Sequence, residues 1–156
     1  MSGLRDEFPI FAAQPAPFHY LDNAATGQIC RAAAEAQWRY ETTARANVKR
    51  GVYRLADAAT VAFQRARGEV AAYLGAADAD EVTFTSGCTL ALNIAANGLA
   101  ERLREDDEIL ISWLEHHSNI VPWQVLCWEK HANLRVLPVD DSGEIQLDEL
   151  VKLINP

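Results

Sequence analysis

The chain has 156 residues, 49% of them hydrophobic and 23% charged, which is typical of a globular domain with one core. A net charge of −8 argues against general binding to nucleic acid or to an anionic membrane surface, and no apolar run approaches the roughly 18 residues of a membrane span. The N-terminal residues lack the apolar stretch of a signal peptide. Three widely spaced cysteines are expected to be reduced thiols, so we expect a cytoplasmic protein.

Residues 1–17 are expected to form an N-terminal arm ahead of one domain over residues 18–156. Three prolines in the arm argue against a regular helix or a central strand. The next segment, residues 18–21, has the composition of a short strand. A turn follows it, in which Asn23, Ala24 and Ala25 are small enough or polar enough to let a ligand approach.

Residues 29–44 predict an alanine-rich helix, and a basic loop that contains Lys49 and Arg50 interrupts it. This loop is either a solvated charge cluster or a segment that reaches an anionic ligand, and the residues alone leave both open. Residues 55–74 give the clearest helix, because apolar side chains recur at helical spacing, and Gly75 is placed to end it.

A second strand–turn–helix unit begins at Val82. Residues 82–85 are β-branched and aromatic, the Ser86-Gly87-Cys88-Thr89 turn follows, and residues 89–100 are rich in Ala and Leu. A Gly turn that leads into a helix N-terminus predicts an anion site, because free N–H groups and the positive end of the helix dipole meet there. The alternative is an ordinary helix capped by Ser or Thr, which this stretch alone favours.

The remainder of the chain alternates strands and helices, which predicts an α/β fold with a mostly parallel sheet flanked by helices. The expected elements are strands at 107–113 and 134–139, helices at 121–131 and 145–154, and a turn at 140–143. The Glu115-His116-His117 cluster follows the first of these strands, as the Ser86–Thr89 turn follows its own. Ligands bind at the carboxyl ends of parallel strands, so the two clusters should share one edge of the sheet.

His116 is either a structural hydrogen-bonding residue or a functional one. Its place beside a predicted phosphate turn favours the two interpretations equally. Adjacent His116 and His117 point in different directions and are poorly placed to bind one metal, and the helical spacing of Cys127 and His131 is best explained by chance. Neither a GxGxxG nor a P-loop motif is present. A monophosphate with an imidazole neighbour remains, and this combination suits pyridoxal phosphate.

Four motifs in order resemble the N-terminal part of the class V aminotransferase family, and in particular the Suf-type cysteine desulfurases and selenocysteine lyases. They are Leu21-Asp22-Asn23-Ala24-Ala25-Thr26, Asn47-Val48-Lys49-Arg50-Gly51-Val52, Phe84-Thr85-Ser86-Gly87-Cys88-Thr89 with Asn93, and Glu115-His116-His117-Ser118-Asn119-Ile120-Val121-Pro122-Trp123-Gln124. The resemblance begins near Phe18 and continues to the end of the sequence.

The resemblance implies the large domain of the fold-type-I pyridoxal-phosphate enzymes, incomplete at its C-terminus, and a homodimer. It also implies an amino-acid substrate: sulfur from L-cysteine passes to an enzyme cysteine as a persulfide, L-alanine is released, and a sulfur-acceptor protein is a further partner. Ser86, Gly87, Cys88 and Thr89 would then bind the cofactor phosphate. His116 would stack on the cofactor ring and assist proton transfer.

The same resemblance places Asn23, Ala24 and Ala25 on the substrate side, with Lys49 and Arg50 near the active site at a dimer interface. The family commonly has Thr where Cys88 stands and His where Lys49 and Tyr53 stand. Cys88 keeps a backbone N–H but offers a weaker side-chain donor than Thr.

Members of this family are much longer, so their Schiff-base lysine and persulfide cysteine are expected beyond Pro156. The chain alone is therefore expected to be inactive. Three alternatives to a desulfurase remain open within the family: an aminotransferase, a selenocysteine lyase or an epimerase. A fourth is a degenerate, non-enzymatic module for binding or dimerisation.

Overall fold

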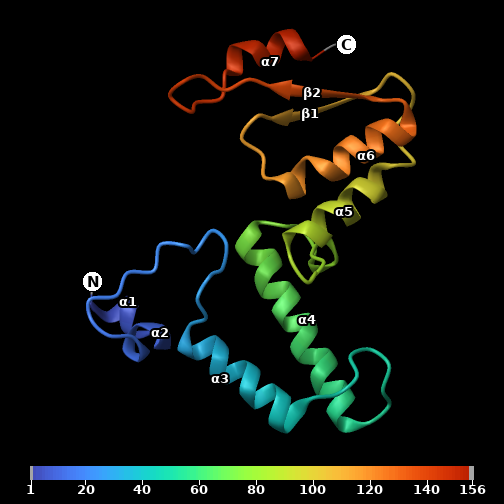
Figure 1. Ribbon diagram of the computed structural model, residues 1–156. Helices are drawn as coiled ribbons and strands as arrows, with labels where there is room; N and C mark the ends of the chain where they lie inside the picture. The colour runs from blue at the N-terminus through green and yellow to red at the C-terminus, as the bar shows by residue number, and fades with distance from the viewer. Residues whose placement is uncertain (1, 155–156) are drawn as a thin grey trace. The chain divides into compact units, whose positions relative to one another are not determined.

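The computed structural model describes residues 2–154 and divides into two compact units, Met1–Thr83 and Phe84–Pro156 (Figure 1). The first residue of the predicted arm and the last two residues of the predicted domain lie outside the described residues. The boundary that the sequence places after residue 17 stays a prediction.

The N-terminal arm contains two short helices, α1 (Ser2–Asp6) and α2 (Pro9–Ala13), so the prediction that it lacks helix is wrong. Pro9 lies in the first turn of α2, where a missing N–H breaks no helical hydrogen bond. The aromatic rings of the arm pack on one another, and the Arg5 guanidinium lies 3.8 Å from the centroid of the Phe11 ring. The Arg31 N–H donates to the Glu7 carbonyl at 2.7 Å and ties the arm to the next helix.

The strand predicted at residues 18–21 does not form. Within the described residues of the first unit no strand lies beside it, so its backbone has no ladder partner. The predicted turn that follows is present. The Thr26 N–H donates to the Asp22 carbonyl at 3.0 Å, and the Tyr20 hydroxyl donates to the Thr26 carbonyl at 2.8 Å.

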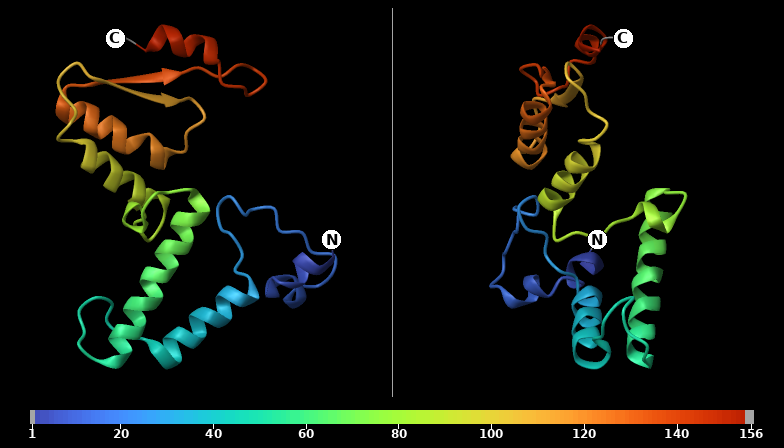
Figure 2. Two further views of the ribbon diagram at one scale, coloured as in Figure 1. Left: turned by 180° about the vertical axis from the view of Figure 1, so that it is seen from behind. Right: turned by 90° about the vertical axis from the view of Figure 1, so that its right-hand side faces the viewer.

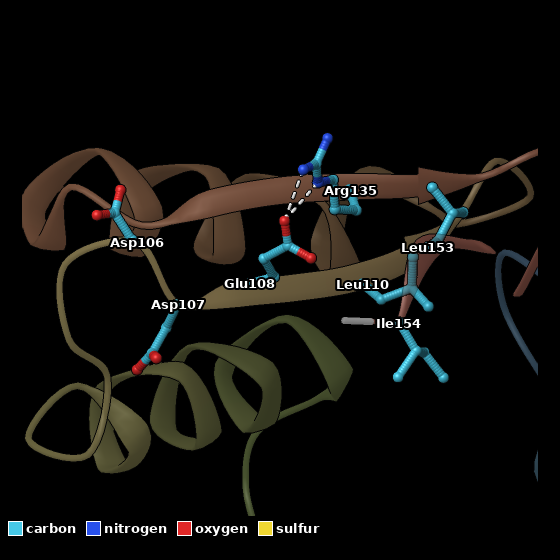
Figure 3. Close-up of a pocket in the computed structure, with 7 residues that line it drawn as sticks. All are labelled: Asp106, Asp107, Glu108, Leu110, Arg135, Leu153 and Ile154. Carbon is cyan, nitrogen blue, oxygen red and sulfur yellow. Dashed lines mark hydrogen bonds and ion pairs between the residues drawn. The ribbon is translucent and has the colours of Figure 1, made fainter. Parts of the chain in front are cut away.

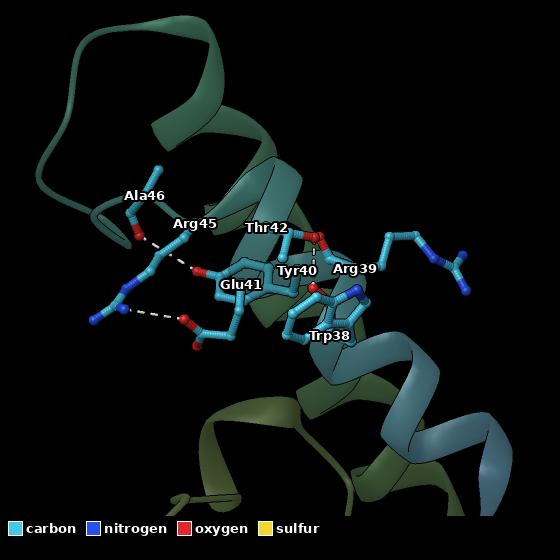
Figure 4. Close-up of polar contacts among 7 residues, drawn as sticks. All are labelled: Trp38, Arg39, Tyr40, Glu41, Thr42, Arg45 and Ala46. Atoms are coloured by element: carbon cyan, nitrogen blue, oxygen red, sulfur yellow. Dashed lines mark hydrogen bonds and ion pairs between the residues drawn. The ribbon is translucent and has the colours of Figure 1, made fainter.

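The helix predicted at residues 29–44 divides into α3 (Arg31–Arg39) and a π-helical turn, η1 (Tyr40–Ala44). The Thr42 hydroxyl donates to the Trp38 carbonyl at 2.7 Å, as Figure 4 shows. Threonine hydroxyls that bond back to the preceding turn bend helices, which accounts for the change in winding.

The longest helix is α4 (Arg54–Leu74), and Gly75 ends it with a φ of 74°, as predicted. Its predicted apolar face is only partly buried. Ala59 is buried, but Leu74 is 68% exposed, and the remaining buried positions are Ala56, Arg67 and Ala71. Short alanine side chains therefore form the packed side of the helix, together with one arginine.

The second unit contains the sheet, a parallel pair in which Glu108 is opposite Asn133 and Ser112 is opposite Leu137. Its elements are α5 (Cys88–Leu99), β1 (Glu108–Ser112), η3 (His117–Asn119), α6 (Val121–Lys130), β2 (Asn133–Leu137) and α7 (Leu147–Leu153). Both α6 and α7 contact β2, and the strand pair runs between them in Figures 1 and 2. This confirms the predicted parallel α/β arrangement.

The strand predicted at residues 82–85 is the second that does not form. Val82 has the φ and ψ of a strand, −101° and 122°, but β1 and β2 are the only strands among residues 2–154 and neither pairs with it. The β-branched composition therefore gives an extended backbone, while a strand also needs a neighbour.

Candidate cofactor site

The predicted phosphate turn leads directly into α5, as the sequence indicates. Gly87 precedes the helix with φ 156° and ψ 173°, a combination that essentially only glycine adopts. A Cβ atom built at Gly87 would meet nothing within 4 Å, so the space above the turn is open. The Thr85 hydroxyl donates to the Gly87 carbonyl at 3.0 Å and closes the turn from outside the helix.

The N-terminus of α5 has no side-chain cap among the described residues and no acidic residue in its first turn. The side-chain-capped helix that the sequence left open is therefore not what the structure shows. The first N–H groups of a helix need an acceptor from outside the helix. The turn fits a phosphate group, which would supply such acceptors where the dipole favours negative charge.

His116 lies in the loop between β1 and α6. Its Nδ1 accepts the Ser118 N–H at 3.2 Å and lies 3.0 Å from the Ser118 hydroxyl. A ring nitrogen that accepts an N–H must be unprotonated, so the proton of the neutral ring is on Nε2. The ring of His117 meets that of His116 edge to face, at an interplanar angle of 84°, and does not point in the same direction.

One cavity of about 340 Å³ joins the two predicted clusters within the second unit. It is lined by Thr89, Asn93, His116, His117, Ser118, Val121 and Pro122. Ser86, Gly87 and Cys88 do not line it, but they form the exposed turn that leads to Thr89. The structure thus brings His116 and Thr89, at the start of α5, to one cavity, although only the Glu115-His116-His117 cluster follows a strand that forms.

Four residues that support the His116 loop were not identified from the sequence as site residues. The Glu115 carboxylate accepts from the Ser112 hydroxyl at 2.9 Å and from the Asn119 amide at 2.7 Å, and the Asn119 oxygen accepts from the Trp123 indole at 2.8 Å. The Asn119 amide first, and the Ser112 hydroxyl second, hold the pKa of Glu115 below its usual value. Only the spacings of three residues between Ser112 and Glu115, and of four residues in the other two pairs, could have indicated the network in advance.

The residues predicted on the substrate side belong to the first unit. Asn23, Ala24 and Ala25 form an exposed turn, and Lys49 and Arg50 are exposed in their loop. Lys49 has a φ of 66°, and its N–H donates to the Thr60 hydroxyl at 2.8 Å. Their part in a substrate site stays a prediction.

Gly51 explains one feature of the same basic loop. A Cβ atom at this position would lie 2.3 Å from the Cβ of Ala56 and 2.8 Å from the ring of Tyr53. Such distances are too short for any larger residue, so Gly51 lets the loop pack closely against the start of α4.

The larger cavity in Figure 3, of about 490 Å³, does not fit a phosphate. Asp106, Asp107 and Glu108 line it, and its Arg135 is already paired with Glu108 at 2.7 Å. No group of three or more potential metal ligands occurs among residues 2–154. Cys127 is buried, which raises the pKa of its thiol.

None of the helices within residues 2–154 is long and apolar enough to cross a membrane. Among the same residues, Cys30, Cys88 and Cys127 are all free thiols.

Comparison with known proteins gives a consistent family. The family model for aminotransferase class-V matches residues 19–156. The chain is 42% identical to a cysteine desulfurase of Synechococcus elongatus, over 97% of this chain and 25% of that protein. It is 45% identical to a probable cysteine desulfurase of Pseudomonas putida, over 97% of this chain and 38% of the relative.

Solved structures agree. The apo cysteine desulfurase from Thermococcus onnurineus superposes with a TM-score of 0.88 at 33% identity, over 97% of this chain and 36% of that one. A cysteine desulfurase from Escherichia coli superposes with a TM-score of 0.82 at 32% identity, over 99% of this chain and 38% of that one. The chain thus spans between about a quarter and two fifths of the length of these relatives, and the predicted partial fold-type-I α/β domain is confirmed. Sequence motifs, fold and matched family model agree that the chain belongs to the class V aminotransferase family.

Proposed function

We propose that this chain supplies the phosphate- and ring-binding part of a pyridoxal-phosphate-dependent cysteine desulfurase. The reaction converts L-cysteine to L-alanine and passes the sulfur to an enzyme cysteine as a persulfide. One observation carries the proposal: Thr89, at the start of the uncapped helix α5, and His116 line the same cavity. The substrate is proposed because the named relatives are cysteine desulfurases.

The first turn of α5 would hold the cofactor phosphate. Its backbone N–H groups donate, the Thr89 hydroxyl adds a side-chain donor, and Gly87 leaves room for the phosphate oxygens. Cys88 contributes through its backbone, since a thiol is a weaker donor than a hydroxyl. Pyridoxal phosphate, when bound, supplies the electron sink for chemistry at the amino-acid carbon.

His116 would pack against the flat ring of the cofactor and orient it. The Nδ1 atom of the imidazole accepts a hydrogen bond from Ser118, which holds the ring in place. The proton that His116 can donate is therefore the one on Nε2. We propose that this proton, held at Nε2, is the one His116 moves during the reaction.

The remaining assignments are also proposals. Asn23, Ala24 and Ala25 would line the substrate side, with Lys49 and Arg50 near a homodimer interface. A sulfur-acceptor protein would be the partner. The free thiols of Cys30, Cys88 and Cys127 support a reducing compartment, the cytoplasm.

Titration of the chain with pyridoxal phosphate, followed by absorbance, dialysis and borohydride treatment, tests the proposal. We expect reversible binding that borohydride does not fix and no conversion of cysteine to alanine, because Lys49, Lys130 and Lys152 lie outside the two cofactor motifs. His116→Ala should weaken binding about fivefold, which corresponds to about 1 kcal/mol of lost ring stacking. His19→Ala, an exposed histidine in the first unit, is the control.

Absence of any affinity for pyridoxal phosphate would overturn the proposed function. A chromophore that borohydride attaches to the protein would show that a lysine of this chain reacts with the cofactor. In that case the noncovalent part of the proposal would be wrong.

A further inference from the structure

The loop that presents His116 is closed on both sides by side-chain hydrogen bonds. Glu115 directly precedes His116 and accepts from Ser112 at the end of β1. Asn119, at the end of the short turn η3, donates to the same carboxylate. A side-chain hydrogen bond from residue 119 to residue 115 therefore closes the turn that contains the histidine.

Asn119 combines a donor role and an acceptor role, which a carboxylate at this position could not do. Its Nδ2 donates to Glu115 at 2.7 Å, and its Oδ1 accepts from the Trp123 indole N–H at 2.8 Å. A carboxylate could accept from Trp123 but could not donate to Glu115. All the atoms of this network belong to residues 112–123, within the second unit.

The closed turn also determines which ring nitrogen of His116 carries the proton. The Asn119 N–H donates to the His116 carbonyl at 2.7 Å, and the Ile120 N–H to the His117 carbonyl at 3.1 Å. These bonds hold the Ser118 N–H against His116 Nδ1 at 3.2 Å. The position of the Ser118 donor, and with it the location of the ring proton, therefore depends on the turn that Glu115 and Asn119 close.

We propose that Glu115 and Asn119 are a pair of positioning residues that hold the His116 ring in one orientation, with its proton on Nε2, facing the cofactor cavity. The part of this proposal that concerns the cofactor rests on the proposed function. The orientation and tautomer of the ring do not, because they follow from hydrogen bonds present without a cofactor.

Exchange of the donor and acceptor roles gives a direct test. Asn119→Asp places two carboxylates opposite each other at the present 2.7 Å contact. Their repulsion should break the link between residues 115 and 119. The double variant E115Q/N119D restores a donor, since the amide introduced at position 115 can donate to the carboxylate introduced at position 119. That carboxylate can still accept from Trp123, and the oxygen of the introduced amide can accept from Ser112.

The primary readout is the ¹⁵N chemical shift of the two ring nitrogens of His116 in the chain without cofactor. We expect a single Nε2–H tautomer in the native chain, a mixture of tautomers in N119D, and return of the single tautomer in E115Q/N119D. Asn97→Asp is the matched control, since Asn97 donates within α5 to the Asn93 carbonyl and lies outside the loop. It introduces the same charge and should leave His116 unchanged.

Circular dichroism separates loss of position from loss of fold. If N119D unfolds the chain, Asn119→Ser, which shortens the side chain and adds no charge, replaces it and should also give mixed tautomers. An unchanged His116 in a folded N119D or N119S chain would overturn the proposal. So would a folded E115Q/N119D chain in which the mixture persists.

Pyridoxal phosphate titration of the same variants completes the test. N119D should lower the affinity about fivefold, and E115Q/N119D should restore it. If the tautomers change as expected but no variant, nor the native chain, binds the cofactor, then the proposed function fails while the assignment of the ring state stands. If the cofactor binds and the tautomers do not respond, the positioning pair fails while the proposed function stands.

Discussion

Gly87 is the residue on which the phosphate turn depends most directly, because of its backbone and not its contacts. Its φ of 156° with a ψ of 173° strains any residue with a Cβ, although the space around it is open. We expect Gly87→Ala to lower the free energy of unfolding by about 1–3 kcal/mol, measured by chemical denaturation. Gly98→Ala, in the last turn of the same helix, should stabilise by about 0.5 kcal/mol, and equal signs for the two variants would contradict this account.

Glu115 gives the second unit a dependence on pH with a definite sign. Hydrogen bonds from Asn119 and then Ser112 lower the pKa of its carboxyl below the reference value of 4.5, so the folded state prefers the ionised form. Its contribution to stability is therefore fully present above pH 4.5 and is lost as the pH falls through the lowered pKa. The thermal midpoint of the native chain should fall more steeply in this acidic range than that of Glu115→Gln.

Glu129→Gln, on α6 and away from the loop, is the control for that comparison. Parallel acid profiles for the native chain and Glu115→Gln would show that the carboxylate adds no stability through these hydrogen bonds.

At the scale of elements, one buried guanidinium joins α4 to the segment that leads to the phosphate turn. Arg67 is 7% exposed, donates to the Val82 carbonyl at 3.0 Å and pairs with Asp80 at 3.0 Å. Arg67→Ala should cost about 2 kcal/mol of unfolding free energy, because the Val82 carbonyl loses its donor and a gap is left beside α4.

Arg65 offers a matched control two residues earlier. It pairs with Glu69 at 2.8 Å on the exposed side of the same helix. Water screens an exposed pair at this spacing, so Arg65→Ala should have a much smaller effect than Arg67→Ala. If the two substitutions were equally costly in chemical denaturation, the buried contacts of Arg67 would not be what joins the two elements.

At the scale of the whole molecule, apolar surface remains in water. Among residues 2–154 no large side chain is fully buried, and Trp38, Trp113 and Trp128 are 72%, 73% and 80% exposed. Trp123 differs, because it is half-buried and its indole donates to Asn119. We expect acrylamide to quench most of the tryptophan fluorescence of dilute protein and to leave a protected fraction from Trp123.

The acrylamide quenching should be measured at several protein concentrations, because this separates exposed tryptophans from tryptophans covered by association. Protection that grows with concentration would mean that copies of the chain associate and cover these tryptophans, because large exposed apolar surfaces promote association. Protection already complete at high dilution would contradict the exposure of the three tryptophans.

The helices were the elements most reliably predicted from the sequence. Residues 55–74 and 89–100 have local signals, an alanine-rich pattern with a glycine at one end, and α4 and α5 begin and end within one residue of the prediction. The strands divide. Residues 108–112 and 133–137 form because they lie next to each other, whereas residues 18–21 and 82–85 have suitable composition but no partner.

The sequence by itself determined the family motifs, the helices α4 and α5, and the glycine turn before α5, and it predicted His116 as a site residue. These depend on residue type and short spacing, which the chain carries locally. Only the tertiary structure decided that Thr89 and His116 line one cavity, that Glu115 and Asn119 close the turn that contains the histidine, and that Arg67 of α4 is buried. The physical reason is that cavities, hydrogen-bond directions and burial arise between segments, where a pattern along one segment carries no information.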